Sequence, residues 1–404
     1  MNSGFFSDFL AFRLLTPIPF LNPGIIIKTV SKSIWRVFRK QIMAWQGILG
    51  HDKIVEFFRR AAQRGRLSGS YLFIGPDGIG KRRFAVALAK SLLCLNNPES
   101  DLNPCGVCAS CREIDNNSHP DLEIVQKPAD KSLIPLELLI GDVEHRNSEG
   151  LCHFLSVKPQ FAKRKIAILD DADFLNAEGA NAMLKTLEEP PPNALFILLG
   201  TSAAKQLPTI RSRCRIVRFD PLSQDDSTQI LQDSHIVDSP VQARLLASIG
   251  QGSLANAVAW KDPDFLEFRQ NILKILGEVP FAPVAFSKLL QDFAVQGDRK
   301  DNASKKRNVI HLAQITVIQF FITLSRAISC GIEDILGNPQ YDDYLVSMVK
   351  SRLTRWKWDS ETANRGVEIT LKLEEMLVRN VHPMLLCDAW ADSLAELFNT
   401  GIKS

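Results

Sequence analysis

Short, nearly continuous apolar runs alternate with amphipathic stretches over the first half of the chain. Runs of this kind predict strands at residues 71–74, 121–125, 165–169, 193–200 and 215–219. Between them, apolar residues recur at helical spacing, as at Phe84, Ala87, Leu88 and Leu92. Strands that are apolar on both faces and alternate with helices are typical of a parallel sheet covered by helices on both faces. We therefore predict an α/β domain over residues 43–220.

The pattern changes after Pro221, where only helical periodicity remains. Three short helices are predicted over residues 221–262, and longer helices follow over residues 263–404. In one of the longer helices, Ile369, Leu373 and Leu377 repeat at the spacing of a bundle helix. The chain is thus predicted to continue into a small helical domain and then into an all-α domain.

Residues 1–42 do not fit this scheme. The stretch from Phe5 to Ile27 is apolar, but charged residues and prolines interrupt it, and it lacks the basic start and small-residue cleavage site of a secretory signal. A basic stretch follows it. We interpret residues 1–42 as a disordered extension or an over-extended start, with a membrane-surface tether as the alternative.

Composition narrows the classes of function. A chain of 404 residues predicts two to three domains. Its 48 basic and 45 acidic residues leave a net charge of +3, which is not the excess of a free-standing nucleic-acid binder. No uncharged apolar run reaches the about 18 residues that a transmembrane helix needs, so no membrane association is expected.

The turn between the first strand and its helix has the pattern of a phosphate-binding loop. Gly75, Gly78, Gly80 and Lys81 stand in the order Gly75-Pro-Asp-Gly78-Ile-Gly80-Lys81. Glycines let backbone N–H groups surround an anion at a helix N-terminus, and the lysine reaches the outer phosphates. The next position normally carries Ser or Thr, whose hydroxyl holds Mg²⁺, but here it is Arg82, and a guanidinium cannot ligate a metal. The alternative is a tight strand-to-helix turn without a ligand.

Carboxylates end the strand predicted at residues 165–169. Asp170 follows the strand directly, where such an acid normally orients the water shell of Mg²⁺ beside a phosphate loop. The next residue, Asp171, is one methylene shorter than the Glu that would activate a water. The sequence therefore leaves open whether ATP and Mg²⁺ bind here, and hydrolysis is not expected.

Four of the eight cysteines are close together in the sequence, in the pattern Cys94-x10-Cys105-x2-Cys108-x2-Cys111. Four thiolates at this spacing can close a tetrahedral site for Zn²⁺, and a complete set of protein ligands indicates a structural site. An iron–sulfur cluster is the alternative, although the final Cys-x3-Cys-Pro of a ferredoxin sequence is missing.

Taken together, these motifs resemble those of the delta prime subunits of the bacterial DNA polymerase III clamp loader, a family of the AAA+ superfamily. The resemblance rests on GPDGIGK (75–81), the cysteine insert (94–111), ILDDAD (168–173), NAMLKTLEEPPP (181–192) and LPTIRSRC (207–214). It implies an AAA+ domain over residues 43–220, a helical lid over residues 221–262 and a helical collar for oligomerisation over residues 263–404.

The family also implies roles for single residues. Thr201 matches the polar sensor of the γ-phosphate, and Arg213 matches the arginine finger that enters the ATP site of a neighbouring subunit. A guanidinium supplied in trans neutralises charge that develops on the transferred phosphate. The alternative for Arg213 is a surface arginine at the start of a strand.

Departures from the family's motor subunits indicate which subunit the chain resembles. Motor subunits carry Ser or Thr at position 82, Glu at position 171 and an arginine within residues 252–256, and all three are changed here. The resemblance thus implies a stator without ATPase activity of its own, within the DNA polymerase III holoenzyme. A gamma/tau-type ATPase subunit of the same complex is the alternative, and a zinc-dependent DNA-binding protein is a second one, which the near-neutral charge disfavours.

The implied partners are the gamma/tau and delta subunits in a five-membered ring, the sliding clamp, and primer–template DNA through the assembled complex. The implied location is the cytoplasm.

Overall fold

The computed structural model describes residues 45–296, 303–338, 341–355, 358–378 and 382–400. The predictions for residues 1–42 lie outside these ranges. Contacts divide the chain into a unit over Met1–Gly47 and a second unit over Ile48–Ser404. The second unit contains every element described below.

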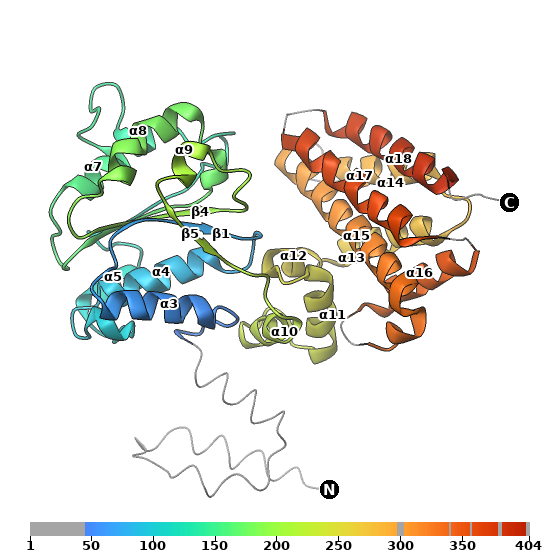
Figure 1. The fold of residues 1–404 in the computed structure, drawn as a ribbon, viewed down its shortest axis with the longest axis horizontal. Helices are drawn as coiled ribbons and strands as arrows, with labels where there is room; N and C mark the ends of the chain where they lie inside the picture. The colour runs from blue at the N-terminus through green and yellow to red at the C-terminus, as the bar shows by residue number, and fades with distance from the viewer. Residues whose placement is uncertain (1–44, 297–302, 339–340, 356–357, 379–381, 401–404) are drawn as a thin grey trace, which may run out of the picture. The chain divides into compact units, whose positions relative to one another are not determined.

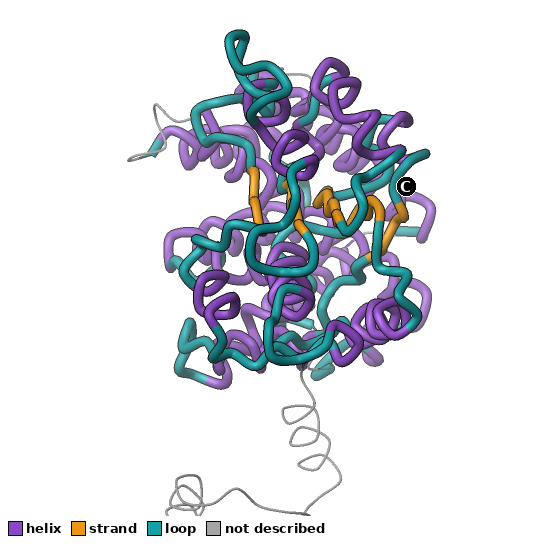
Figure 2. Tube along the Cα trace, turned by 90° about the vertical axis from the view of Figure 1, so that its left-hand side faces the viewer, coloured by secondary structure: helices purple, strands orange, loops and turns teal. Residues whose placement is uncertain are grey.

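A five-stranded parallel sheet forms the core of the first part of this unit (Figures 1 and 2). The strand order is β2-β3-β4-β1-β5. The strands are β1 (Gly69–Ile74), β2 (Leu122–Val125), β3 (Lys165–Leu169), β4 (Ala194–Gly200) and β5 (Arg215–Arg218). All residues of β3 and β4 are buried, whereas three of the four residues of the edge strand β5 are exposed. The predicted parallel sheet is confirmed, and its central strands are the most apolar ones.

Helices cover both faces of this sheet, as Figure 2 shows. They are α3 (Asp52–Gln63), α4 (Lys81–Leu92), α5 (Ala109–Asp115), α6 (Glu137–Ile140), α7 (Gly150–Ser156), α8 (Ala177–Glu188) and α9 (Pro208–Arg211). Short 3-10 turns lie at Glu99–Asp101 and Ala172–Phe174.

Successive side chains of β1 point to opposite faces of the sheet and pack against the helices on each face. Tyr71 and Phe73 pack with Phe58 of α3, and Phe73 also packs with Phe84 of α4, in an aromatic cluster. Leu72 and Ile74 point to the other face, where they belong to a core that includes residues of α8. This period of two is what a strand buried on both faces requires.

Three short helices follow the sheet: α10 (Gln224–Asp233), α11 (Pro240–Gly250) and α12 (Leu254–Ala259). Each begins at a serine whose hydroxyl accepts a hydrogen bond from a backbone N–H of the first turn, namely Ser223, Ser239 and Ser253. Their core includes the buried ring of Trp260.

Longer helices complete the chain. They are α13 (Pro263–Gly277), α14 (Pro283–Val295), α15 (Ala303–Cys330), α16 (Asp343–Arg355), α17 (Ser360–Val378) and α18 (Pro383–Thr400), with a 3-10 turn at Ile332–Asp334. A single hydrophobic core joins them. Leu312 of α15 also belongs to the core of α10–α12, and the domain boundaries at residues 220 and 262 stay predictions.

Helix α15 is long and apolar enough to cross a membrane, over Lys305–Cys330. However, 67% of its most apolar window is buried inside the protein. Because buried core helices pass the same test, this helix is weak evidence for a membrane span.

Candidate nucleotide site and cysteine module

The predicted phosphate loop runs from the end of β1 to the start of α4. Two of its glycines have positive φ angles, 73° at Gly78 and 95° at Gly80, which residues with a Cβ rarely adopt. Space is also limited, because a Cβ added at Gly78 would lie 2.5 Å from the Cβ of Ala255 in α12. The loop therefore has the backbone shape of an anion-binding turn at a helix N-terminus.

Lys81 begins α4 and is buried, with 8% of its surface exposed. Its Nζ donates hydrogen bonds to the carbonyl oxygens of Gly75 (2.7 Å) and Pro76 (2.8 Å) and lies 3.7 Å from Oδ1 of Asp77. Burial lowers the pKa of Lys81, and the carboxylates of Asp77, Asp173 and Asp170 oppose that effect. The ammonium group is thus held against the loop where an outer phosphate would meet it.

Arg82 lies between the ends of two neighbouring strands. Its Nη1 lies 3.4 Å from Oδ2 of Asp170, which follows β3. The same nitrogen donates a short hydrogen bond to Oε1 of Gln126, which follows β2. The guanidinium therefore contacts the carboxylate that would orient a magnesium ion, and the residues do not fit the metal site that a phosphate loop normally has.

Asp171 has the left-handed backbone conformation, with φ 58°. Burial, together with the neighbouring Asp170 carboxylate, raises the pKa of Asp171. A carboxyl group in this setting ionises less readily than that of an exposed aspartate.

Thr201 follows β4 and is hydrogen-bonded to Asp173, a residue to which the sequence analysis assigned no role. The backbone N–H of Thr201 donates to Asp173 Oδ2 at 3.0 Å, and its hydroxyl donates to the same oxygen in a short bond. The Gln206 amide also donates to Asp173. Asp173 thus holds the predicted sensor at the end of β4. The ILDDAD motif contains Asp173, but nothing local identifies its partners.

These residues line a cavity of about 710 Å³. Beyond the loop and the strand ends, Leu254, Ala255 and Val258 of α12 contribute to its wall. The N–H of Leu254 donates to the carbonyl oxygen of Gly78 at 2.9 Å, so the first turn of α12 is attached directly to the phosphate loop. All the predicted nucleotide-site residues line this cavity except Gly75, whose carbonyl oxygen accepts a hydrogen bond from Lys81.

Arg213 is not among the residues that line this cavity. It lies just after α9, where its Nε donates to Oε1 of Glu188 at 2.6 Å and its Nη2 pairs with the same oxygen. Nη1 donates to the carbonyl oxygen of Thr209 (3.1 Å) and to the hydroxyl of Ser212 (3.2 Å). The Arg213 side chain is 28% exposed and that of Glu188 is 50% exposed. The guanidinium is therefore held in one direction at the surface by the end of α8.

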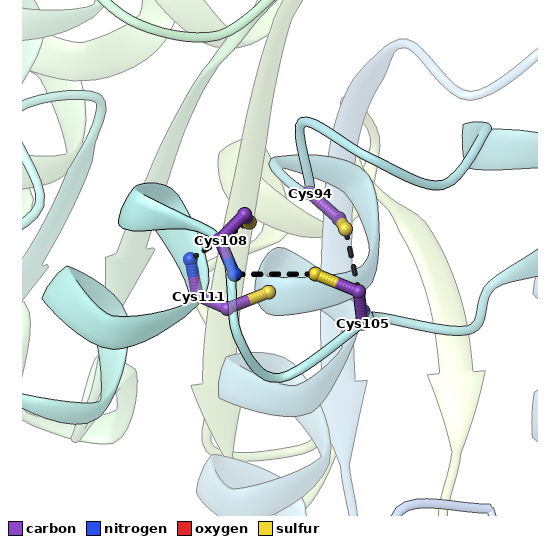
Figure 3. A group of neighbouring side chains, drawn as sticks. All are labelled: Cys94, Cys105, Cys108 and Cys111. Carbon is purple, nitrogen blue, oxygen red and sulfur yellow. Dashed lines mark hydrogen bonds between the residues drawn. The ribbon is translucent and has the colours of Figure 1, made fainter.

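The four predicted metal ligands lie together after α4 (Figure 3). Their Sγ atoms all lie within 4.8 Å of one another. Backbone N–H groups of three of the cysteines donate to the sulfur atoms, from Cys105 to Cys94 (3.3 Å), from Cys108 to Cys105 (3.3 Å) and from Cys111 to Cys108 (3.4 Å). A backbone hydrogen bond from Val107 is the main cause that lowers the pKa of Cys105 to about 6, whereas burial raises that of Cys111 to about 12. Four converging thiols with N–H donors form a donor set that could hold a metal ion.

A buried polar network connects this module to the sheet. Ser110, beside Cys111, donates to the carbonyl oxygen of Leu93 (2.6 Å) and lies 2.9 Å from Nε2 of His119. The N–H of Asp121 donates to Nδ1 of the same ring. His119 therefore has a structural role in this network.

The carboxylate of Asp121 in turn accepts three backbone N–H groups, from Gln160 (2.7 Å), Phe161 (2.7 Å) and Ala162 (2.8 Å). Burial opposes ionisation, but these three donors prevail and lower the pKa of Asp121.

Comparison with known proteins gives sequence matches to subunits of DNA polymerase III. Residues 50–223 match the family described as "DNA polymerase III, delta subunit". The chain is 32% identical over 224 residues to DNA polymerase III subunit delta' of Bacillus subtilis, covering 55% of this chain and 63% of that protein. It is 30% identical over 231 residues to subunit tau of Escherichia coli, covering 56% of this chain and 33% of that protein.

A DNA polymerase III gamma subunit-related protein from Thermotoga maritima aligns in structure with a TM-score of 0.34 at 16% identity, covering 84% of this chain and 99% of that one. The chain spans 63% of the length of the delta' relative and 33% of the length of the tau relative. The sequence matches show that residues 50–223 of this chain are similar to that family, and that the chain is similar to the delta' and tau subunits of DNA polymerase III.

Proposed function

We propose that this chain is the delta prime, or stator, subunit of a DNA polymerase III clamp loader. In this proposal it does not hydrolyse ATP itself. It supports ATP-driven loading of a sliding clamp onto primed DNA by offering Arg213 to the ATP site of a neighbouring gamma/tau-type subunit.

One observation carries this proposal: the ion pair between Arg82 and Asp170 lies where hydrolysis needs a metal. Two other changes agree with it. Asp171 is one methylene shorter than the Glu that would activate a water, so its carboxylate reaches less far. The residues of α12 that line the cavity are Leu254, Ala255 and Val258, none of which can donate a charge-assisted bond to a phosphate from its side chain.

The position of Arg213 supports a role in trans. The guanidinium lies outside its own cavity and is partly exposed at the surface. Its bonds to Glu188 and Thr209 hold it in one orientation before a neighbour docks. Such preorganisation lowers the entropic cost of placing a charge against a phosphate.

The remaining parts of the proposal follow from the family. The helical region from residue 263 would form the collar of a hetero-pentameric ring with gamma/tau and delta subunits, and contacts with the sliding clamp and primer–template DNA would be made through that ring. The ring would act in the cytoplasm. Zn²⁺ would occupy the site of Cys94, Cys105, Cys108 and Cys111 and stabilise that module.

The test is ATP turnover by the reconstituted ring with Arg213→Ala in this subunit. Arginine fingers are worth about 10³-fold or more in turnover. We expect ATP hydrolysis at the one site that Arg213 enters to fall by about that factor, while sedimentation shows that the ring still assembles. Arg211→Ala is the matched control, because Arg211 is an exposed arginine at the end of α9, two residues away. Unchanged turnover with Arg213→Ala would remove the finger from the proposal.

A gamma/tau-type ATPase is the second candidate, because several relatives bear that name. Steady-state hydrolysis by the isolated chain distinguishes the two. Turnover of about one per second that Lys81→Ala abolishes would favour the ATPase, and we expect none above background.

A further inference from the structure

Phosphate loops normally hold Mg²⁺ between a hydroxyl that follows the lysine and an acid at the end of a nearby strand. In this chain those positions are Arg82 and Asp170. The sequence shows that the hydroxyl is absent. Only the structure shows which groups the longer arginine side chain contacts.

The Arg82 guanidinium reaches across the open edge of the sheet to the acid itself. Its Nη1 lies 3.4 Å from Oδ2 of Asp170 and donates to Gln126 at the end of the adjacent strand. Since β2 and β3 are paired neighbours in the sheet, the two acceptors lie side by side. They hold the cation in the wall of the cavity.

This arrangement excludes a divalent cation for two reasons. A guanidinium has five N–H donors and no lone pair, so Arg82 supplies no ligand. It also adds a positive charge a few ångströms from the carboxylate that a metal would need, and like charges at that distance repel.

The cavity nevertheless retains the groups that contact phosphate. Lys81, Arg82 and Arg83 line it at the start of α4, beside the glycine turn. Four carboxylates lie in its wall. Asp170 is paired with Arg82, and Asp173 accepts hydrogen bonds from Thr201 and Gln206. Asp77 lies 3.7 Å from Lys81 Nζ, and burial raises the pKa of Asp171. Lys81 itself lines the cavity, and the glycine turn lies at the N-terminus of α4, where backbone N–H groups can meet an anion.

We propose that Arg82 takes the place of the magnesium ion, so that this cavity binds a nucleoside di- or triphosphate as the metal-free anion. A fixed guanidinium neutralises phosphate charge as a metal does, but it cannot activate a water or exchange ligands during hydrolysis. The bound nucleotide would then be a lasting structural ligand of the stator. This inference deepens the proposed function and concerns the chain's own cavity, whereas Arg213 acts elsewhere.

The experiment is equilibrium binding of a fluorescent ADP analogue and a fluorescent ATP analogue to the full chain, with excess Mg²⁺ or with EDTA. For the wild-type chain we expect a Kd in the micromolar range that changes less than about twofold between the two conditions. Arg82→Thr restores the hydroxyl and frees Asp170, so its affinity is expected to be at least about tenfold higher with Mg²⁺ than with EDTA.

A matched control separates the position from the charge. Arg83→Thr removes the same charge from the wall of the same cavity, one residue along the exposed start of α4. We expect it to weaken binding equally with and without Mg²⁺. Binding of Mn²⁺ alone, followed by electron paramagnetic resonance, gives a readout without nucleotide: we expect Arg82→Thr to take up an ion that the wild type does not.

Three outcomes would overturn the inference. The first is wild-type binding that EDTA weakens tenfold, and the second is the absence of binding by the wild type in both conditions. The third is an Arg82→Thr variant that is no more sensitive to the metal than Arg83→Thr. None of these depends on the ring, so a failure here is distinct from a failure of the Arg213 experiment.

Discussion

The cysteine module and the nucleotide cavity lie at opposite ends of α4. They differ in how many of the groups that each kind of site needs are present. In the module, four sulfur atoms converge within 4.8 Å and accept backbone N–H groups. In the cavity, the loop and Lys81 retain the shape that binds phosphate, but Arg82 is paired with the acid that would hold a metal. One site has all its ligands, and the other has only its anion-binding half.

The difference teaches that a fold can retain a ligand-shaped cavity while losing the chemistry that the cavity performs. A tetrahedral structural site binds its metal far less tightly when one of its four ligands is lost. A phosphate cradle is made largely of backbone, and it tolerates a changed side chain at its edge. Metal binding by the first kind of site therefore depends on every ligand. The second kind of site can keep its shape when one side chain at its edge changes.

The largest effect is expected from breaking the module with Cys108→Ser. Three ligands hold Zn²⁺ far less tightly than four, so about one equivalent of metal is expected to leave, with a fall in Tm of about 10 °C for a loss of about 3 kcal/mol. Elemental analysis and calorimetry measure both. Cys330→Ser is the control, because Cys330 is exposed and outside the cluster, and equal metal content in the two variants would contradict the site.

A smaller effect is expected in the cavity from Lys81→Ala. Charge-assisted hydrogen bonds contribute about 1.5–3 kcal/mol, so affinity for the metal-free nucleotide is expected to fall by about 10- to 100-fold in the binding assay. Lys90→Ala removes a lysine from the same helix, where it pairs with Asp115 and not with the loop. If both variants bind equally, Lys81 is not part of the anion site.

The smallest effect tests the network that connects the module to the sheet. Asp121→Asn leaves three backbone N–H groups without their carboxylate, at a cost of about 1–3 kcal/mol in the free energy of unfolding at pH 7. Because the folded pKa of Asp121 lies below its unfolded value of about 3.9, the stabilisation is present above that value. It is lost as the pH falls through the folded pKa.

Urea unfolding of the wild type and of Asp121→Asn at several pH values between 7 and 2.5 measures this dependence. The difference between the two proteins should shrink below about pH 4. Asp142→Asn is the control, since Asp142 also accepts backbone N–H groups but is exposed, and its effect should be smaller. A difference for Asp121→Asn that stays constant with pH would mean that the carboxylate charge contributes nothing.

Much of the fold could be predicted because its signals are local. The central strands β3 and β4 are continuous apolar runs, and the serines that begin α10, α11 and α12 mark their own helices. The start of helix α15, at Ala303, has no such local signal. Its first turn is polar, and hydrophobic periodicity cannot detect such a turn.

The sequence by itself determined the phosphate loop and the cysteine module, because the glycines, the lysine and the four cysteines of each motif stand close together along the chain. Only the tertiary structure decided that Arg82 meets Asp170, 88 residues away, and that Glu188 holds Arg213. The strand order β2-β3-β4-β1-β5 decides which strand ends are neighbours. Contacts across those ends depend on the packing of the whole sheet, which no local pattern encodes.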